Sequence, residues 1–146
     1  MKLVVISGYF NPLHGGHLDM IDAAAELGDR LLVIVNNDEQ QILKKGKIIL
    51  SQENRYRLIT ALKNVDEVML AIDKDPPVTE TLRIVAKTHP YDRIVFANGG
   101  DRSAPELVPE RDVCQEYNIE MVYGVGGTHK ADSSTRINQA IGHESK

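Results

Sequence analysis

The chain has 146 residues, of which 42% are hydrophobic and 26% are charged, and its formal net charge at pH 7 is −4. This length allows one domain with a core of ordinary size, and the composition is typical of a globular protein. The negative charge argues against a general nucleic-acid binder, and no apolar run is long enough for a membrane span or a signal peptide. The single cysteine, Cys114, allows no internal disulfide, so we expect a reduced, cytoplasmic protein.

Five apolar runs predict five strands. They cover residues about 2–7, 30–35, 67–72, 93–97 and 119–123. The first run is continuously apolar, which is typical of a strand that is covered on both faces. Helical patterns separate the runs, and parallel neighbours need such crossovers. The order therefore predicts a single α/β domain over residues 1–146, with a doubly wound, five-stranded parallel sheet.

Helices are predicted wherever apolar residues recur at helical spacing. The first carries Leu18 and Ile21, and we expect Gly28 to cap its C-terminal end. A short helix over 38–43 precedes a basic, glycine-broken loop at 44–47. Further helices are expected to begin at Ser51, at Pro76-Pro77, at Pro109 and at residues 132–136.

Polar or glycine-rich segments follow four of the predicted strands. They cover residues 7–17, 36–47, 98–102 and 124–136. In doubly wound sheets, ligands bind beyond the carboxyl ends of the strands, near the point where the strand order reverses. We therefore expect these four segments to lie along one edge of the sheet and to form one site.

The first of these segments holds His14 and His17, with Gly15 and Gly16 between them. The spacing places both histidines on one face of a helix's first turn. Glycine allows a close approach of the backbone, and free N–H groups at a helix start attract anions. Two imidazoles there indicate phosphate chemistry. Zinc is the alternative, but it needs at least a third ligand and none stands nearby, so we predict no metal ligands among the side chains.

Two other segments carry groups that suit phosphate oxygens. The lysines of segment 44–47 are either a solvated loop or a positive wall opposite the histidines. Ser133, Ser134, Thr135 and Arg136 either cap the last helix or form a phosphate cradle. Because both segments follow predicted strands, we favour the functional interpretation for each.

The remaining glycine-rich segments are less specific. The turn Gly99-Gly100-Asp101 is equally compatible with an ordinary turn and with part of a site. Segment 124–130 lacks the second glycine and the hydroxyl of a phosphate-binding P-loop. The three-glycine dinucleotide fingerprint is also absent after the first strand, which argues against a dehydrogenase.

Segment 8–17, Gly-Tyr-Phe-Asn-Pro-Leu-His-Gly-Gly-His, resembles the HxGH signature of the cytidylyltransferase-like nucleotidyltransferases, a family with a Rossmann-like fold. The resemblance continues through Asn37-Asp38-Glu39, Lys45-Gly46-Lys47, Glu53 with Arg55, residues 65–68 and residues 133–137. It implies an enzyme that joins a nucleoside triphosphate to a phosphorylated acceptor and releases pyrophosphate. The chain is similar to the glycerol-3-phosphate cytidylyltransferase and heptose-1-phosphate adenylyltransferase members, but Tyr9 and Asn11 stand where they usually carry Thr and Asp.

The resemblance also implies roles for individual residues. His14 and His17 would stabilise the charge that develops on the α- and β-phosphates, and Lys45 would neutralise a phosphate from the other side, with Arg136 also catalytic. Nucleotide contacts are implied for Gly8, Tyr9, Phe10, Gly16, Gly99, Asp101, Ser133, Ser134 and Thr135. Acceptor contacts are implied for Asn11, Asp38 and Lys44.

The resemblance leaves the substrates open. Family frequency favours transfer of CMP from CTP to an acceptor such as glycerol 3-phosphate. The alternative is transfer of AMP from ATP to a sugar phosphate of the heptose 1-phosphate type or to a cofactor precursor. A nucleotide-binding sensor without catalysis is the non-enzyme alternative. The family further implies Mg²⁺ held mainly by the substrate phosphates and a homodimer, with no nucleic-acid or membrane partner.

Overall fold

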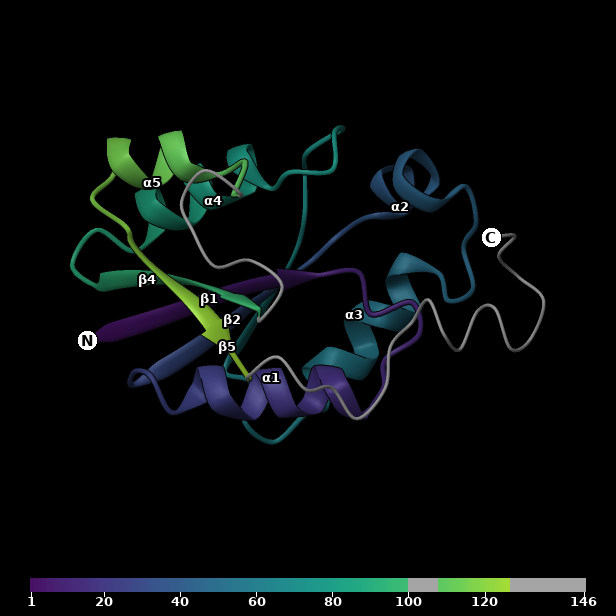
Figure 1. Ribbon diagram of the computed structural model, residues 1–146, viewed down its shortest axis with the longest axis horizontal. Coiled ribbons are helices and arrows are strands. Elements are labelled where there is room, and N and C mark those ends of the chain that lie inside the picture. Colours follow the sequence, from purple (N-terminus) through teal and green to yellow (C-terminus); the bar gives the residue numbers. More distant parts are fainter. Residues whose placement is uncertain (100–107, 127–146) are drawn as a thin grey trace.

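The computed structural model describes residues 1–99 and 108–126 of the chain, and all five predicted strands are present (Figure 1). The first six elements are β1 (Lys2–Gly8), α1 (Gly15–Ala25), β2 (Arg30–Val35), α2 (Asp38–Lys45), α3 (Gln52–Thr60) and β3 (Glu67–Leu70). They are followed by α4 (Thr79–Thr88), β4 (Arg93–Gly99), α5 (Arg111–Glu116) and β5 (Glu120–Val125). The helix predicted after residue 132 lies outside the described residues. None of the described helices is both long and apolar enough to cross a membrane.

The five strands form one sheet in the order β3-β2-β1-β4-β5, and every pair is parallel. The chain builds outward from β1 to β3 and then returns to place β4 on the other side of β1. The order therefore reverses between β1 and β4, where Val5 lies opposite Phe96. This arrangement confirms the Rossmann-like, doubly wound fold, and it puts the exits of β1 and β4 beside the point where such sheets bind ligands.

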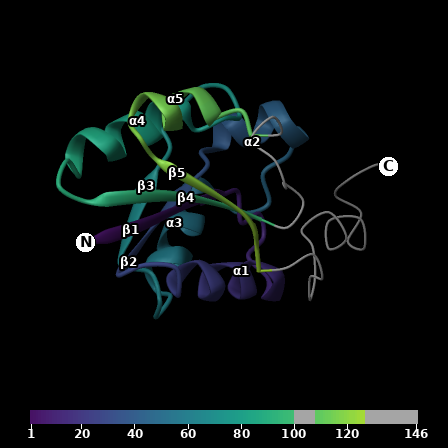
Figure 2. The same ribbon diagram turned by 60° about the vertical axis from the view of Figure 1, so that its left-hand side comes forward.

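Helices cover both faces of the sheet, as Figures 1 and 2 show from two directions. Helices α4 and α5 lie on one face, and α1 and α3 lie on the other. Leu3 and Val5 of β1 belong to the core under α4 and α5, whereas Val4 and Ile6 belong to the core over α1 and α3. This two-sided burial is the physical reason for the continuously apolar strands.

The sequence predicted Gly28 as the C-cap of the first helix, and this prediction is wrong. Helix α1 ends at Ala25, and Glu26 is its C-cap. A Cβ on Gly28 would lie 2.8 Å from the carbonyl oxygen of Lys2 and 2.8 Å from Cγ2 of Val4. Gly28 is therefore required because the chain passes directly against β1.

The basic segment 44–47 is also not simply a loop. Helix α2 continues through Lys44 and Lys45 in its last turn, and Gly46 is the C-cap with a left-handed φ of 76°. Lysines are favourable there because the last turn of a helix exposes carbonyl oxygens. The two lysines therefore leave a rigid helix in different directions.

Several predicted boundaries shift. Strand β3 ends at Leu70 rather than at residue 72, and α5 begins at Arg111 rather than at Pro109. Helix α4 begins at Thr79, after the two prolines, because the carboxylate of Asp73 accepts hydrogen bonds from the backbone nitrogens of Glu80 and Thr81. A side chain from before the prolines thus sets the start of this helix.

Candidate active site at the carboxyl edge of the sheet

His14 and His17 form a reciprocal capping box at the start of α1. His14 is the N-cap, and its Nδ1 accepts from the backbone nitrogen of Gly16 at 3.0 Å. Nδ1 of His17 accepts from the backbone nitrogen of His14 at 3.2 Å. The rings are stacked, with their centroids 3.8 Å apart. Because each Nδ1 is an acceptor, each ring is neutral and carries its proton on Nε2.

Phe10 supports the His14–His17 pair from the side of the core. Its side chain is buried in the core over α1, and its ring meets the His17 ring edge-on with centroids 5.0 Å apart. Its backbone is left-handed, with φ at 52°, which is uncommon for a bulky residue and is typical of functional turns. A Cβ on Gly8 would lie 2.7 Å from Cζ of Phe10. The glycine thus makes room for the ring that holds His17.

Arg55 joins the segments that leave β1 and β2. It is fully buried in α3, and its Nη1 donates to the carbonyl oxygens of Tyr9 at 2.7 Å and Asn36 at 2.6 Å. Its Nε donates to the carbonyl oxygen of Leu50, and its Nη2 donates to the carboxylate of Asp38 at 2.7 Å. Asp38, predicted to contact the acceptor, is therefore engaged by a buried guanidinium at the start of α2.

Asn11 anchors the segment between α2 and α3. Its side chain is 3% exposed, and its Oδ1 accepts from the backbone nitrogens of Ile49 at 3.0 Å and Leu50 at 2.8 Å. Its Nδ2 donates to the carbonyl oxygen of Lys47. The amide thus supplies an acceptor and a donor at once, which the carboxylate of an aspartate could not do. Its predicted contact with the acceptor remains a prediction.

Lys44 lies over the exit turn of β1. Its Nζ is 4.8 Å from the centroid of the Tyr9 ring, within the usual range of a cation–π contact. Lys44 and the next residue of the same helix, Lys45, are both exposed, and the ring contact is made by Lys44. The structure thus brings Lys44, rather than Lys45, to the segment that carries the histidines.

Three buried amides hold the exit of β2 to the segment before α4. Gln40 Oε1 accepts from the side chain of Asn36 and the backbone nitrogen of Asn37, and its Nε2 donates to the carbonyl oxygen of Asp75. The Asn37 side chain donates to the carbonyl oxygens of Ala71 and Asp73. These amides explain the polar exit of β2 structurally, without a ligand.

The other predicted site residues divide into two groups. Gly16 is in the first turn of α1, and Gly99 is the last residue of β4, so both lie at the edge where the histidines are. Asp101, Ser133, Ser134, Thr135 and Arg136 lie outside the described residues. Among the described residues, no three His, Cys, Asp or Glu side chains are grouped as a metal site requires.

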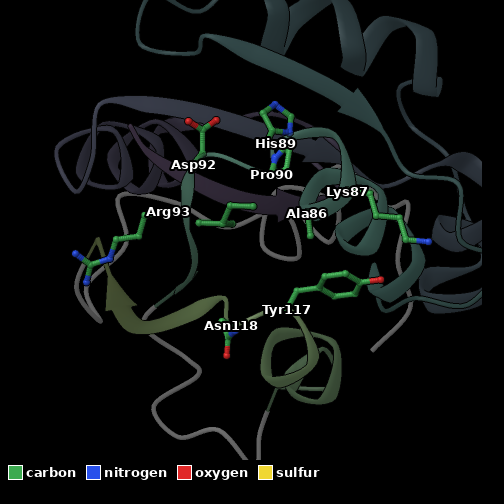
Figure 3. Close-up of a pocket in the computed structure, with 9 residues that line it drawn as sticks. Ala86, Lys87, His89, Pro90, Asp92, Arg93, Tyr117 and Asn118 are labelled. Carbon is green, nitrogen blue, oxygen red and sulfur yellow. The ribbon is translucent and has the colours of Figure 1, made fainter.

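A cavity of about 460 Å³ lies at the opposite edge of the sheet, where β4 and β5 begin (Figure 3). Three of its titratable side chains are engaged in local contacts. Asp92 contacts the amino terminus at 3.3 Å, Arg93 pairs with Glu120 at 2.8 Å, and His89 contacts Glu67 at 3.2 Å. Its place and its pairing distinguish this cavity from the histidine site.

Comparison with known proteins identifies the family. The profile that describes the cytidylyltransferase-like family matches residues 5–140. The chain belongs to this family. The match extends from β1 through the Ser-Ser-Thr-Arg segment, so the cytidylyltransferase-like resemblance of the HxGH segment holds for nearly the whole sequence.

Several curated relatives align with parts of the chain. The FAD synthase of Ferroglobus placidus is 43% identical over 75 residues, which cover 51% of this chain and 49% of that protein. The bifunctional protein HldE of Gluconobacter oxydans is 33% identical over 123 residues, which cover 83% of this chain and 24% of that protein. The matched part is thus about half of the first relative and about a quarter of the second.

Solved structures show the same cytidylyltransferase-like fold. The lipopolysaccharide core biosynthesis protein of Thermoplasma volcanium superposes with a TM-score of 0.68 at 27% identity, over 90% of this chain and 99% of that one. A putative nicotinate-nucleotide adenylyltransferase of Vibrio parahaemolyticus gives a TM-score of 0.60 at 17% identity, over 99% and 89% of the two chains. The second likeness is one of fold alone.

Arg55 is the site residue whose role the sequence motifs did not predict. The family resemblance includes Arg55 but implies no role for it. One local signal does point to it, because Arg55 and Ile59 lie four residues apart on α3 and are both buried. An arginine on the apolar face of a short helix needs partners, and here they come from three distant segments.

Proposed function

We propose that this chain transfers a nucleotidyl group from a nucleoside triphosphate to a phosphorylated small molecule and releases pyrophosphate. The observation that carries the proposal is the capping box of His14 and His17 at the start of α1. It fixes two neutral imidazoles beside the reversal of the strand order, with Nε2 as the donor of each ring. Membership of the cytidylyltransferase-like family supports this reaction class.

The reaction is an in-line attack by a phosphate oxygen of the acceptor on the α-phosphorus. A new P–O bond forms as the bond between the α-phosphorus and the bridging oxygen breaks, and pyrophosphate takes the electron pair. The acceptor phosphate is already ionised at neutral pH, so no general base is required. Catalysis therefore depends on positioning and charge stabilisation. Hydrogen-bond donors that are already in place before the substrate binds contribute most to both.

The two histidines fit this task because their protonation state is set by the backbone. The Nε2–H groups donate to phosphate oxygens without first losing a proton, and the N-terminus of α1 adds its positive end. Lys44 adds a full positive charge, with Lys45 as the alternative. Ser133, Ser134, Thr135 and Arg136 stay in the proposal as the cradle of the β- and γ-phosphates.

Mg²⁺ remains part of the proposal. The carboxylate of Asp38 is paired with Arg55, and the described residues contain no group of three potential ligands. These residues fit an ion that is held mainly by phosphate oxygens and water, as Mg²⁺ commonly is. When bound, the ion would supply further neutralisation of the triphosphate.

We propose ATP as the nucleotide. FAD contains AMP joined to flavin mononucleotide, so a FAD synthase completes its product by adenylyl transfer. The relative from Ferroglobus placidus, at 43% identity over 75 residues, therefore supports an adenylyl donor. The description of the family supports CTP, which family frequency also favoured. The acceptor class is a phosphate monoester such as glycerol 3-phosphate, a sugar phosphate or a cofactor precursor.

The test is release of pyrophosphate from each of the four nucleoside triphosphates with a panel of phosphorylated polyols, sugars and flavin mononucleotide. ATP with one acceptor should release it, and His17→Asn should slow the release by about a hundredfold or more. A preference for CTP would overturn the choice of nucleotide while keeping the reaction. Binding without any release would favour a nucleotide sensor and overturn the proposal of an enzyme.

The homodimer and the cytoplasmic location also stay proposals. Ile42 and Leu43 of α2 are 53% and 62% exposed, which supports an interface on this helix. Sedimentation of the wild type should give twice the chain mass, and Leu43→Glu should give the monomer. A wild type that sediments as a monomer would overturn this part of the proposal.

A further inference from the structure

The contact between Tyr9 and Lys44 joins two segments that are far apart in the sequence. Tyr9 is the first residue after β1, and Lys44 is in the last turn of α2. The Lys44 ammonium lies 4.8 Å from the centroid of the Tyr9 ring. Attraction between a cation and a ring face at this distance holds the side chain in place.

The backbone that carries the Tyr9 ring is held in place by buried contacts. The carbonyl oxygen of Tyr9 accepts a 2.7 Å hydrogen bond from the buried Arg55, and the next residue, Phe10, is buried. Asn11 then holds the segment that follows α2 through the backbone nitrogens of Ile49 and Leu50. The ring and the helix that carries Lys44 are therefore both attached to the turn that leads to the histidines.

The nature of the contact matters for a phosphate. An aromatic face attracts a cation without neutralising its charge, whereas a carboxylate would neutralise it. The acidic residues of α2, Asp38 and Glu39, are in its first turn, whereas Lys44 is in its last turn, and Asp38 is bound to Arg55. An ammonium that lies against a ring keeps its positive charge for the oxygens of a phosphate dianion.

Lys45 leaves the helix in a different direction from Lys44. Successive residues of a helix point about 100° apart, so two adjacent lysines do not face one ligand. Both lysines are exposed, but it is Lys44 that lies over the Tyr9 ring, and Gly46 then ends the helix with a left-handed backbone. The geometry thus separates two lysines that the sequence alone leaves equivalent.

We propose that Tyr9 is a positioning residue, whose ring holds the Lys44 ammonium in place for the phosphate of the acceptor. This inference rests on the proposed function and adds a specificity determinant to it. It also gives a role to a residue at which the chain departs from the Thr usual in similar family members.

The kinetic test measures kcat and the KM of each substrate in the full chain. Tyr9→Leu removes the ring, and it should raise the acceptor KM about five- to tenfold, with the triphosphate KM changed less than about twofold. Tyr9→Phe keeps the ring and should stay within about twofold of the wild type. Lys44→Met should raise the acceptor KM at least as much as Tyr9→Leu and more than Lys45→Met does, and the control at an exposed lysine outside the site, Lys63→Met, should leave it unchanged.

The double variant Tyr9→Leu/Lys44→Met completes the cycle. It should be no worse than Lys44→Met alone, because the ring acts only through the ammonium. Additive effects of the two changes, an equal loss in Tyr9→Phe and Tyr9→Leu, or an equal effect of Lys45→Met would each overturn the proposal.

A second readout separates this inference from the proposed function. Reductive ¹³C-methylation of the lysines gives each amine an NMR signal, and Lys44→Arg identifies the signal of Lys44. We expect this signal to be shifted by the ring in the wild type and in Tyr9→Phe but not in Tyr9→Leu, and to move when inorganic phosphate is added. If no triphosphate and acceptor react, the proposed function fails while this result still supports the pair. A Lys44 signal that is insensitive to both Tyr9→Leu and phosphate overturns the pair.

Discussion

Arg55 and Asp38 form an ion pair in which Nη2 and Oδ1 are 2.7 Å apart, the arginine is fully buried and the side chain of the aspartate is 28% exposed. The same guanidinium also bonds the carbonyl oxygens of Tyr9, Asn36 and Leu50. One side chain from α3 thus satisfies the backbone groups that are left over where β1 and β2 end. The carboxyl edge of the sheet depends on it.

Arg55→Met should therefore lower the free energy of unfolding by about 3–5 kcal/mol, because the carbonyl oxygens and the Asp38 carboxylate lose their donor together. Urea denaturation followed by circular dichroism measures this change. Arg93→Met is the matched control, since its pair with Glu120 is 70% and 43% exposed and is worth less than about 1 kcal/mol. Equal midpoints for the two variants would contradict the role assigned to Arg55.

His17→Asn should separate catalysis from stability. The Asn oxygen can still accept from the backbone nitrogen of His14, so the free energy of unfolding should change by less than about 1 kcal/mol. The Nε2 donor is lost, and turnover should fall by about a hundredfold or more. Pyrophosphate release and urea denaturation are measured on the same sample. His89→Asn, at the opposite edge of the sheet, should leave turnover unchanged, and a His17→Asn enzyme with normal turnover would exclude the predicted role.

Gly28→Ala should destabilise the chain by about 1–3 kcal/mol, because the new methyl group would press on the backbone of β1. Gly46→Ala offers a comparison of another kind. Its Cβ would meet nothing within 4 Å, so only its left-handed backbone, with φ at 76°, would be strained, at about 1 kcal/mol. Gly46→Asn should restore part of that loss, whereas Gly28→Asn should not restore the loss at position 28. A tolerated Gly28→Ala, with an unchanged urea midpoint, would argue against the close approach.

Cys114 should resist thiol reagents until the chain unfolds. Burial, and secondarily the Glu110 carboxylate, raise the pKa of the Cys114 thiol to about 12. The unfolded chain releases this proton at an ordinary pKa of about 8.5, so the contribution to stability is complete below that pH and is lost as the pH rises toward 12. Labelling with a disulfide reagent at pH 8 should be slow in buffer and fast in urea. Between pH 7.5 and 10, the wild type should also lose more stability than Cys114→Ala.

The sequence predicted the parts of the structure that depend on short-range patterns. The continuously apolar runs identified buried parallel strands. Adjacent residues such as Val4 and Val5 face opposite sides of the sheet, and both are buried, so neither position favours a polar side chain. His14 and His17 could be placed at a helix start because their spacing and the adjacent glycines are local features. Their reciprocal capping was not predicted, because it depends on ring orientation.

The contacts that hold the site could not be predicted, because they join distant segments. Arg55 reaches a carbonyl oxygen 46 positions away, and Asn11 reaches a backbone nitrogen 39 positions away. No periodicity encodes such pairs. Gly28 has the same explanation, since a glycine needed for close packing resembles a glycine that ends a helix. Lys44 and Lys45 were predicted in a loop but belong to α2. Basic residues beside a glycine occur both in loops and in the last turn of a helix, so the local pattern does not distinguish the two.

The position of Tyr9 also makes the site visible to spectroscopy without a label. The chain has five tyrosines and no tryptophan, so tyrosine alone gives its near-ultraviolet fluorescence. Tyr91 and Tyr117 lie toward the opposite edge of the sheet, whereas the Tyr9 ring carries the ammonium of Lys44. A substrate that draws this ammonium away changes the electric field at the Tyr9 ring. Comparing the wild type with Tyr9→Phe would isolate that signal and follow occupancy of the site in real time.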